Sequence, residues 1–227
     1  MIARDIAAHL AKSTQTEQKG RIRGQKHQMK RIGIGIGLVV LAIAAFVIWP
    51  QKLPPGTLPD APPEAAQSGD IVFMQGRSFG ARLQNLTRPI YGAYSHVGIL
   101  DRRADGDYII HATPAKKRGL NKDGIVLEAW DFMVTEERLL KVHVMQVAAA
   151  DKTVKARAIE RAHAYMQAGV PFDPDYDNTE HEKIYCSELV LLAYQPLSVK
   201  PDNFDSDDLI YVGALAASPY LEDLASP

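Results

Sequence analysis

The stretch Ile184-Tyr185-Cys186-Ser187-Glu188-Leu189-Val190 contains the single cysteine of this chain of 227 residues. Its pattern predicts an apolar helix that begins at the cysteine, and the N-terminus of a helix favours the charged form of a thiol. One cysteine forms no internal disulfide, so this thiol is either a small buried side chain or a reactive group. The choice depends on whether the chain supplies a base for it.

A catalytic thiol needs a base, and the base needs a third group that orients it. Of the seven histidines, His96 and His111 lie among apolar residues in two successive predicted strands. An imidazole without a partner is costly in such surroundings. If the strands form a hairpin with Asp101 opposite Gly106, His96 lies directly opposite His111, with about 5 Å between their Cβ atoms.

The other five histidines are expected to have no part in such a site. His9 and His27 precede an uncharged apolar segment that separates them from the rest of the chain. We expect solvated positions for His143 on the outer face of a strand, for His163 on a helix surface and for His181 in a polar loop.

The remaining pattern predicts a domain of strands and helices. Alternating or apolar runs indicate strands at 71–74, 96–100, 108–111, 125–128 and 140–145, and residues 209–212 fit a short additional strand. One helix is expected over 152–168, ending at Gly169, and a second over about 186–195, stopping at Pro196. This arrangement predicts an α+β domain with a mainly antiparallel sheet.

Several short motifs together resemble a known family. Ser95-His96-Val97-Gly98-Ile99, then a strand ending in a polar residue, then Tyr185-Cys186-Ser187-Glu188-Leu189-Val190 is similar to the permuted papain-like hydrolases, the YiiX/YebB-like branch of the NlpC-type cysteine peptidases. Gly69-Asp70-Ile71-Val72 and Gly169-Val170-Pro171-Phe172-Asp173 fit the same pattern. The resemblance covers roughly residues 68–212 and implies a circularly permuted papain-like domain, with its sheet packed against helices.

The resemblance also implies roles for three residues. Cys186 is the nucleophile, His96 is the general base, and His111 occupies the third polar position, which orients the base. Many members of this branch carry a glutamate at the third position. A histidine there is similar to the related lecithin:retinol acyltransferase-like enzymes.

Three further residues are expected to line or shape the pocket. Tyr185 either helps to stabilise an oxyanion, as the backbone N–H of Cys186 does, or packs in the core. Asp173 forms a pocket wall or an Asx turn, of which the turn is favoured. Glu188 should point away from the thiol and support a loop.

The N-terminal part of the chain predicts a membrane anchor. Residues 1–31 hold eight Lys or Arg against two Asp or Glu, and residues 32–49 are apolar and uncharged. Eighteen helical residues span about 27 Å, close to the thickness of a bilayer core. The positive charge before this segment places the N-terminus in the cytoplasm and the rest of the chain outside the plasma membrane, on the periplasmic side.

These features divide the chain into a basic cytoplasmic segment (1–31), a transmembrane signal anchor (32–49), a proline-rich linker (50–68), a papain-like hydrolase domain (69–215) and a loose C-terminal tail (216–227). A cleaved signal peptide is the alternative to the anchor, and the length of the apolar run favours the anchor. Gly33 and Gly37 form a weak helix-pairing motif that would allow a homodimer.

The predicted function is a membrane-anchored cysteine hydrolase of the cell envelope that cleaves an acyl bond through a thioester, with an amide in peptidoglycan peptides as the first substrate. A lipid deacylase or acyltransferase with the same triad is the alternative, and a non-catalytic envelope scaffold is a third reading. No cofactor is expected, and the balanced charge does not suggest nucleic acid as a partner. A metal site of His96, His111 and Cys186 lacks the usual close ligand spacing.

Overall fold

The chain was analysed as a computed structural model, which describes residues 58–77, 94–114, 123–202 and 209–224. The predicted cytoplasmic segment and membrane anchor lie outside these ranges. Among the described residues, no helix combines the length and the apolar character needed to cross a bilayer.

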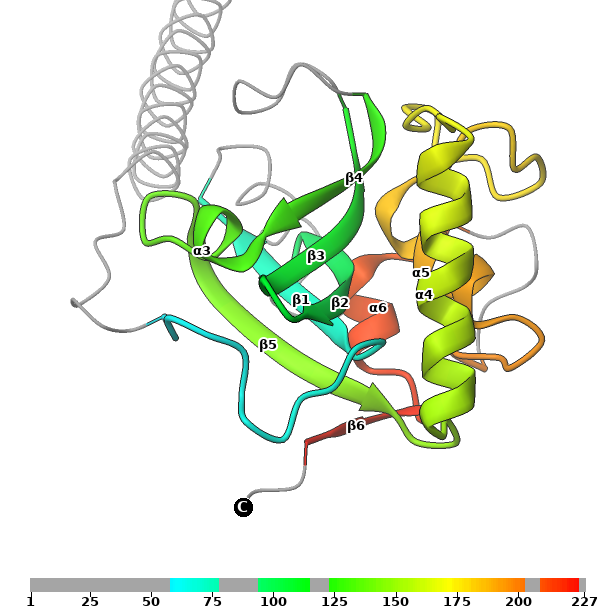
Figure 1. The fold of residues 1–227 in the computed structure, drawn as a ribbon. Coiled ribbons are helices and arrows are strands. Elements are labelled where there is room, and N and C mark those ends of the chain that lie inside the picture. Colours follow the sequence, from blue (N-terminus) through cyan, green and yellow to red (C-terminus); the bar gives the residue numbers. More distant parts are fainter. Residues whose placement is uncertain (1–57, 78–93, 115–122, 203–208, 225–227) are drawn as a thin grey trace, which may run out of the picture. The chain divides into compact units, whose positions relative to one another are not determined.

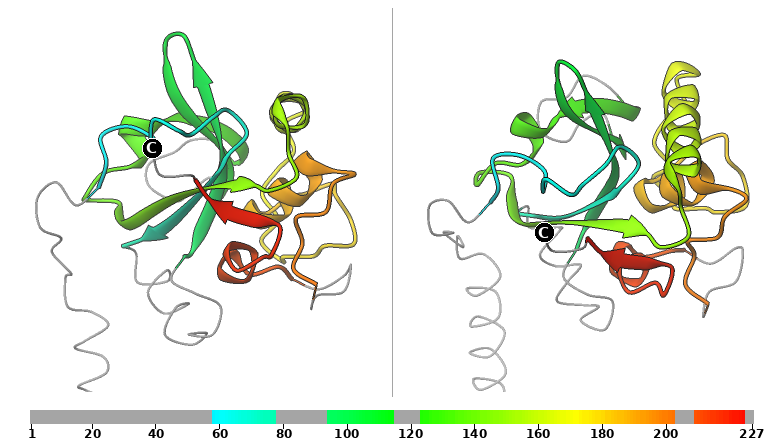
Figure 2. Two further views of the ribbon diagram at one scale, coloured as in Figure 1. Left: turned by 90° about the horizontal axis from the view of Figure 1, so that it is seen from below. Right: turned by 60° about the horizontal axis from the view of Figure 1, so that its bottom comes forward.

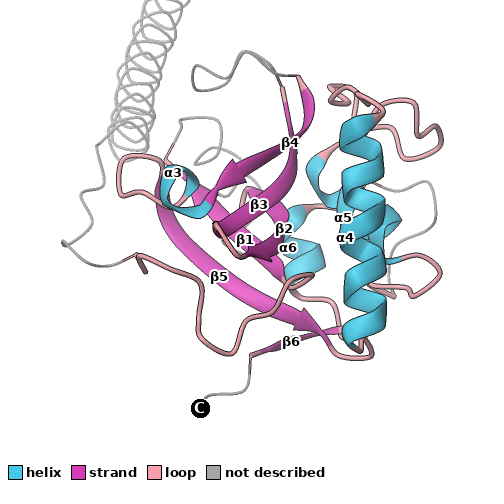
Figure 3. Ribbon diagram, viewed as in Figure 1, coloured by secondary structure: helices cyan, strands magenta, loops and turns pink. Residues whose placement is uncertain are grey.

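Six antiparallel strands form one sheet in the order β4-β3-β2-β1-β5-β6 (Figure 1). Their bounds are β1 Ile71–Gly76, β2 His96–Arg103, β3 Gly106–Thr113, β4 Gly124–Ala129, β5 Leu139–Val147 and β6 Leu221–Asp223. The helices are α3 Trp130–Met133, α4 Lys152–Gln167, α5 Cys186–Tyr194 and α6 Val212–Ala216. The prediction of an α+β domain with an antiparallel sheet is confirmed (Figure 3).

The two faces of the sheet bury two separate apolar clusters. Alternate residues of a strand point to opposite faces, so Phe73, Val97 and Ile110 pack beneath α4 and α5. Their neighbours Met74 and Leu100 belong to the second cluster on the other face, which the strands curl around (Figure 2). β1 has neighbours on both sides and is buried along its whole length.

Helix α4 is tied to the sheet by a buried ion pair. Lys155 Nζ lies 2.6 Å from Asp70 Oδ1, and the two side chains are almost fully buried. Asp70 Oδ2 also accepts the Gln67 N–H, so neither oxygen of this buried carboxylate lacks a partner. α4 ends where Gly169 adopts a positive φ of 69°, close to the predicted end.

The structure differs from the sequence-based expectation at both ends of the domain. The second half of the proline-rich linker is packed: Ala66 is buried, and the carbonyl of Pro59 accepts the indole N–H of Trp130. At the other end, the tail that was expected to be loose contributes β6, which pairs with the edge of β5. Residues 209–211 form no strand and instead lead into α6.

Candidate active site

The cysteine lies at the first residue of helix α5, as predicted. Tyr185 precedes the helix in an extended conformation, and its N–H donates to Glu188 Oε2 at 3.2 Å. Ser187 Oγ donates to the carbonyl of Ile210 at 2.6 Å, which fixes the helix start against the segment before α6. Cys186 is therefore at the end of the helix where the partial positive charge of the macrodipole favours a thiolate.

The two strand histidines meet, although their register differs from the predicted one. Arg103, and not Asp101, lies opposite Gly106, so the hairpin is shifted by two residues and His96 is diagonal to His111. A shift of two keeps both side chains on the same face of the sheet. His96 Nε2 lies 2.9 Å from His111 Nδ1, and the rings stand edge to face at 4.9 Å.

A glutamate extends this pair. Glu128 lies on β4, and its Oε2 is 3.1 Å from His111 Nε2. The His111 and Glu128 side chains are only 2% and 6% exposed, so water does not replace either partner. The sequence-based reasoning missed Glu128; the available signal was a single charged residue inside an otherwise apolar strand at 124–129.

The helix that begins at Cys186 contacts the hairpin that carries the two histidines. Helix α5 packs across β2 and β3. Cys186, 8% exposed, belongs to the buried cluster on the α4 and α5 side of the sheet, which includes Val97 and Ala112 of these two strands. The fold therefore brings the N-terminus of α5 to the hairpin that carries both histidines.

The three pocket candidates have mainly structural surroundings. The Tyr185 side chain is buried, and its hydroxyl accepts the N–H of Ile210 at 3.4 Å, which fits the core-packing alternative. Asp173 accepts the N–H groups of Asp175 and Asp177, which is the Asx-type turn that the sequence suggested.

Glu188 pairs with a histidine of the preceding loop. His181 Nδ1 lies 2.7 Å from Glu188 Oε1, so His181 is not simply solvated as predicted. Burial raises the pKa of Glu188 to about 7, and the bonds from His181 and Tyr185 act in the opposite direction. The pair links the loop to the first turn of α5.

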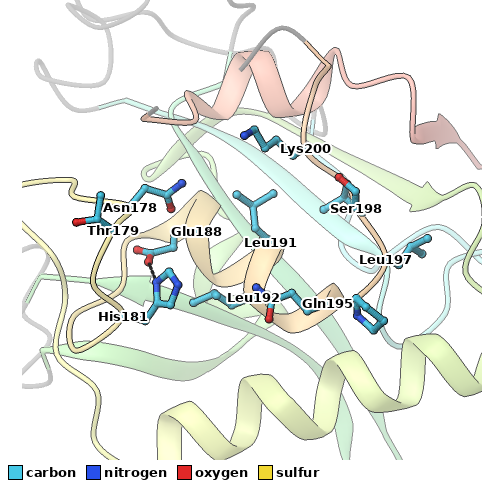
Figure 4. A pocket seen from close by; sticks show the side chains of 12 residues that line it. Asn178, Thr179, His181, Glu188, Leu191, Leu192, Gln195, Leu197, Ser198 and Lys200 are labelled. Atoms are coloured by element: carbon cyan, nitrogen blue, oxygen red, sulfur yellow. Dashed lines mark hydrogen bonds and ion pairs between the residues drawn. The ribbon is translucent and has the colours of Figure 1, made fainter. Parts of the chain in front are cut away.

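A pocket of about 520 Å³ lies against the outer face of α5 (Figure 4). Its wall on the helix is formed by Glu188, Leu191, Leu192 and Gln195, and Lys200 lies across from them. Neither Cys186 nor the two strand histidines line it, so this pocket is separate from the thiol.

The two remaining described histidines make contacts outside this site. His143 Nε2 lies 2.7 Å from Asp223 Oδ1 and is 38% exposed, in keeping with a surface position. His163 was predicted to be solvated, but its Nε2 lies 2.9 Å from the buried Asp101, because α4 packs near the end of β2. Within the described ranges, no group of three His, Cys, Asp or Glu residues is placed to hold a metal ion.

Comparison with known proteins places this geometry in a family. The family described as permuted papain-like amidase enzyme, YaeF/YiiX, C92, matches residues 65–206. Among solved structures, the metalloprotein yiiX from Escherichia coli O157:H7 is similar with a TM-score of 0.55 and 20% identity. The match covers 72% of this chain and 98% of that one, and at this identity it supports the fold alone. No curated protein matches the chain.

Proposed function

The chain belongs to the permuted papain-like amidase family YaeF/YiiX, C92, and from this membership we propose that it hydrolyses an amide through a thioester on Cys186. Membership implies hydrolase activity of the cysteine type. The observation that carries the assignment of roles is the continuous chain from His96 through His111 to Glu128. His96 and His111 belong to the β2–β3 hairpin, and the helix that begins at Cys186 packs on these two strands.

The Glu128 carboxylate determines which ring nitrogen of each histidine carries the proton. Glu128 accepts a hydrogen bond, so His111 carries its proton on Nε2 and has a lone pair on Nδ1. His111 Nδ1 then accepts from His96 Nε2–H, which leaves the lone pair of His96 on Nδ1. His96 Nδ1 is therefore the atom that takes the thiol proton, and the positive charge that forms is stabilised through His111.

The reaction follows from these positions. The Cys186 thiolate attacks the carbonyl carbon, and the oxyanion is stabilised by the N-terminus of α5, including the Cys186 N–H. His96 returns its proton to the leaving amine as the C–N bond breaks, which leaves a thioester. Water, deprotonated by His96, then attacks the thioester and releases a carboxylic acid and the free thiol.

Glu128 is assigned here as a positioning residue, because it acts through His111 and not on the substrate. We expect Glu128→Leu to lower kcat about 100-fold with little change in KM, since the His111 N–H loses its acceptor. Glu128→Gln keeps an acceptor and should restore most of kcat. Steady-state kinetics of both variants would check this, and an unchanged kcat in Glu128→Leu would remove Glu128 from the mechanism.

Peptidoglycan peptides are the proposed substrate class, because the family is one of amidases and the sequence predicts an envelope location. The full-length protein in detergent should convert muropeptides to products with a new amine and a new carboxylate, detected by mass spectrometry. Since the chain has one thiol, protein alkylated with iodoacetamide is the matched control. Muropeptides that remain intact under conditions where an acyl-enzyme forms would contradict this substrate class.

Lipid ester hydrolysis or acyl transfer is the second candidate. It is favoured by His111, because a histidine at the third position resembles the lecithin:retinol acyltransferase-like enzymes. Release of fatty acid from phospholipid vesicles in the same assay, with muropeptides intact, would support this candidate over the amidase.

We also propose that a single helix over 32–49 anchors the domain on the outer side of the plasma membrane. Such an anchor would hold the thiol close to both cell-wall peptides and membrane lipids. Protease added outside spheroplasts should digest the domain, and protection of the domain would contradict this placement.

A further inference from the structure

Tyr176 has an unusual backbone conformation. Its φ is +58°, and among the described residues it is the one residue other than glycine with a positive φ. A bulky side chain rarely adopts this left-handed conformation, which is strained and persists where surrounding contacts enforce it.

Asp173 enforces this conformation from both sides. Its Oδ1 accepts the Asp175 N–H at 3.0 Å, and its Oδ2 accepts the Asp177 N–H at 2.6 Å. These two N–H groups belong to the residues before and after Tyr176, and Asp173 itself is buried. The turn therefore holds the Tyr176 backbone in place between two hydrogen bonds to one carboxylate.

The ring that this turn presents contacts the residue that precedes Cys186. It contacts the Tyr185 ring edge to face at 5.6 Å, and Tyr185 directly precedes Cys186. Phe172 supports the same ring at 5.9 Å. The pKa of Tyr176 is raised above its ordinary value, first by burial and then by the negative charge of Cys186, in keeping with its position near the sulfur.

Although two aromatic rings support it, Tyr176 remains 43% exposed. An aromatic side chain fixed by its backbone and packed on two rings has a defined orientation at little cost in conformational entropy. Its free surface is apolar apart from the hydroxyl, so it can bury the apolar part of a bound molecule.

We propose that Tyr176 is a specificity-determining residue whose ring forms the wall on which the apolar part of the acyl group packs while its carbonyl carbon lies at the Cys186 sulfur. The inference rests on the proposed thioester mechanism and extends it. The acyl side of the substrate would then contact the Tyr176 ring. This ring is held in place by the Asp173 turn and belongs to the loop before α5.

A series of p-nitrophenyl esters tests this, with acetyl, butyryl and octanoyl groups and one common leaving group. We expect the full-length protein in detergent to prefer the longer acyl groups. In Tyr176→Ala, kcat/KM should fall about 10-fold for octanoate and less than about twofold for acetate, because the lost contact is apolar. Tyr176→Phe should behave as the wild type.

The Tyr176→Gly variant removes the ring without leaving a strained backbone, because glycine adopts a φ of +58° freely. It therefore distinguishes the loss of the ring contact with the acyl group from a general loss of folding. It should show the same loss of chain-length preference as Tyr176→Ala, with a Tm at least as high as that of Tyr176→Ala. An equal loss for all three esters in these variants, or a uniform loss of kcat in Tyr176→Phe, would overturn the inference.

The ester series also separates this inference from the mechanism it rests on. If the wild type hydrolyses no ester and no acyl-enzyme forms, the thioester mechanism is wrong, and the role of Tyr176 is wrong with it. If hydrolysis is abolished by alkylation of Cys186 but the preference for long chains survives in Tyr176→Ala and Tyr176→Gly, only the role of Tyr176 is wrong.

Discussion

The Cys186→Ala variant is expected to lose hydrolysis by about 10⁴-fold or more, down to the background rate. The proposed reaction forms a bond to sulfur, and no other residue of the chain carries a thiol that could replace it. Measurement of product release at saturating substrate would check the loss, and mass spectrometry should find the thioester adduct in the wild type and not in the variant.

Folding of this variant should be nearly unaffected. The side chain is small and lies at a helix start, so removal of the sulfur costs about 1 kcal/mol in burial. Cys186→Ser provides the matched control: it keeps the shape and a hydroxyl but not an acidic nucleophile, and it should be as inactive as the alanine variant. Substantial hydrolysis by either variant with a normal Tm would contradict covalent catalysis by Cys186.

The His96→Ala variant should lose about 10³-fold in kcat, because it removes the group proposed to accept and return the proton. The same change should slow alkylation of Cys186 by iodoacetamide at neutral pH, since the thiol then lacks a nearby proton acceptor. Because kcat and the alkylation rate are measured on the same variant, a parallel fall in both would connect the lost turnover with a lower reactivity of the Cys186 thiol.

His143→Ala is the control for this variant. His143 lies on β5, which β1 separates from the His96 strand. Its side chain is partly exposed, and its carboxylate partner is Asp223 at the surface. Its replacement should change kcat less than twofold. If His96→Ala alkylates and turns over as fast as His143→Ala, His96 is not the base.

The sequence predicted the local elements of this site well, since each is encoded by a continuous stretch. The start of α5 at Cys186 followed from one apolar run, and the shared face of His96 and His111 followed from a hairpin register with Asp101 opposite Gly106. The register of the hairpin was wrong by two residues. Its loop consists only of Ala104 and Asp105, and a shift of two leaves every side chain on its predicted face.

Features that depend on pairing between distant segments were not predictable in the same way. Glu128 reaches His111 because β4 pairs with β3 across a loop whose length does not fix the register. The short strand β6 carries too few residues for a pattern, and it forms because β5 offers it an edge. The left-handed conformation of Tyr176 depends on the Asp173 turn, and an aromatic residue gives no local signal for it.

The separation in the chain between the histidine hairpin and the cysteine helix has a consequence for biosynthesis. The hairpin closes through contacts between neighbouring segments, but α5 follows only after β4, β5 and α4. A nascent chain emerging from the ribosome therefore holds an ordinary thiol, with neither the helix N-terminus nor the imidazoles arranged around it. Under the proposed mechanism, the thiol becomes reactive only when α5 docks on β2 and β3, so an incompletely folded chain is expected not to cleave acyl bonds.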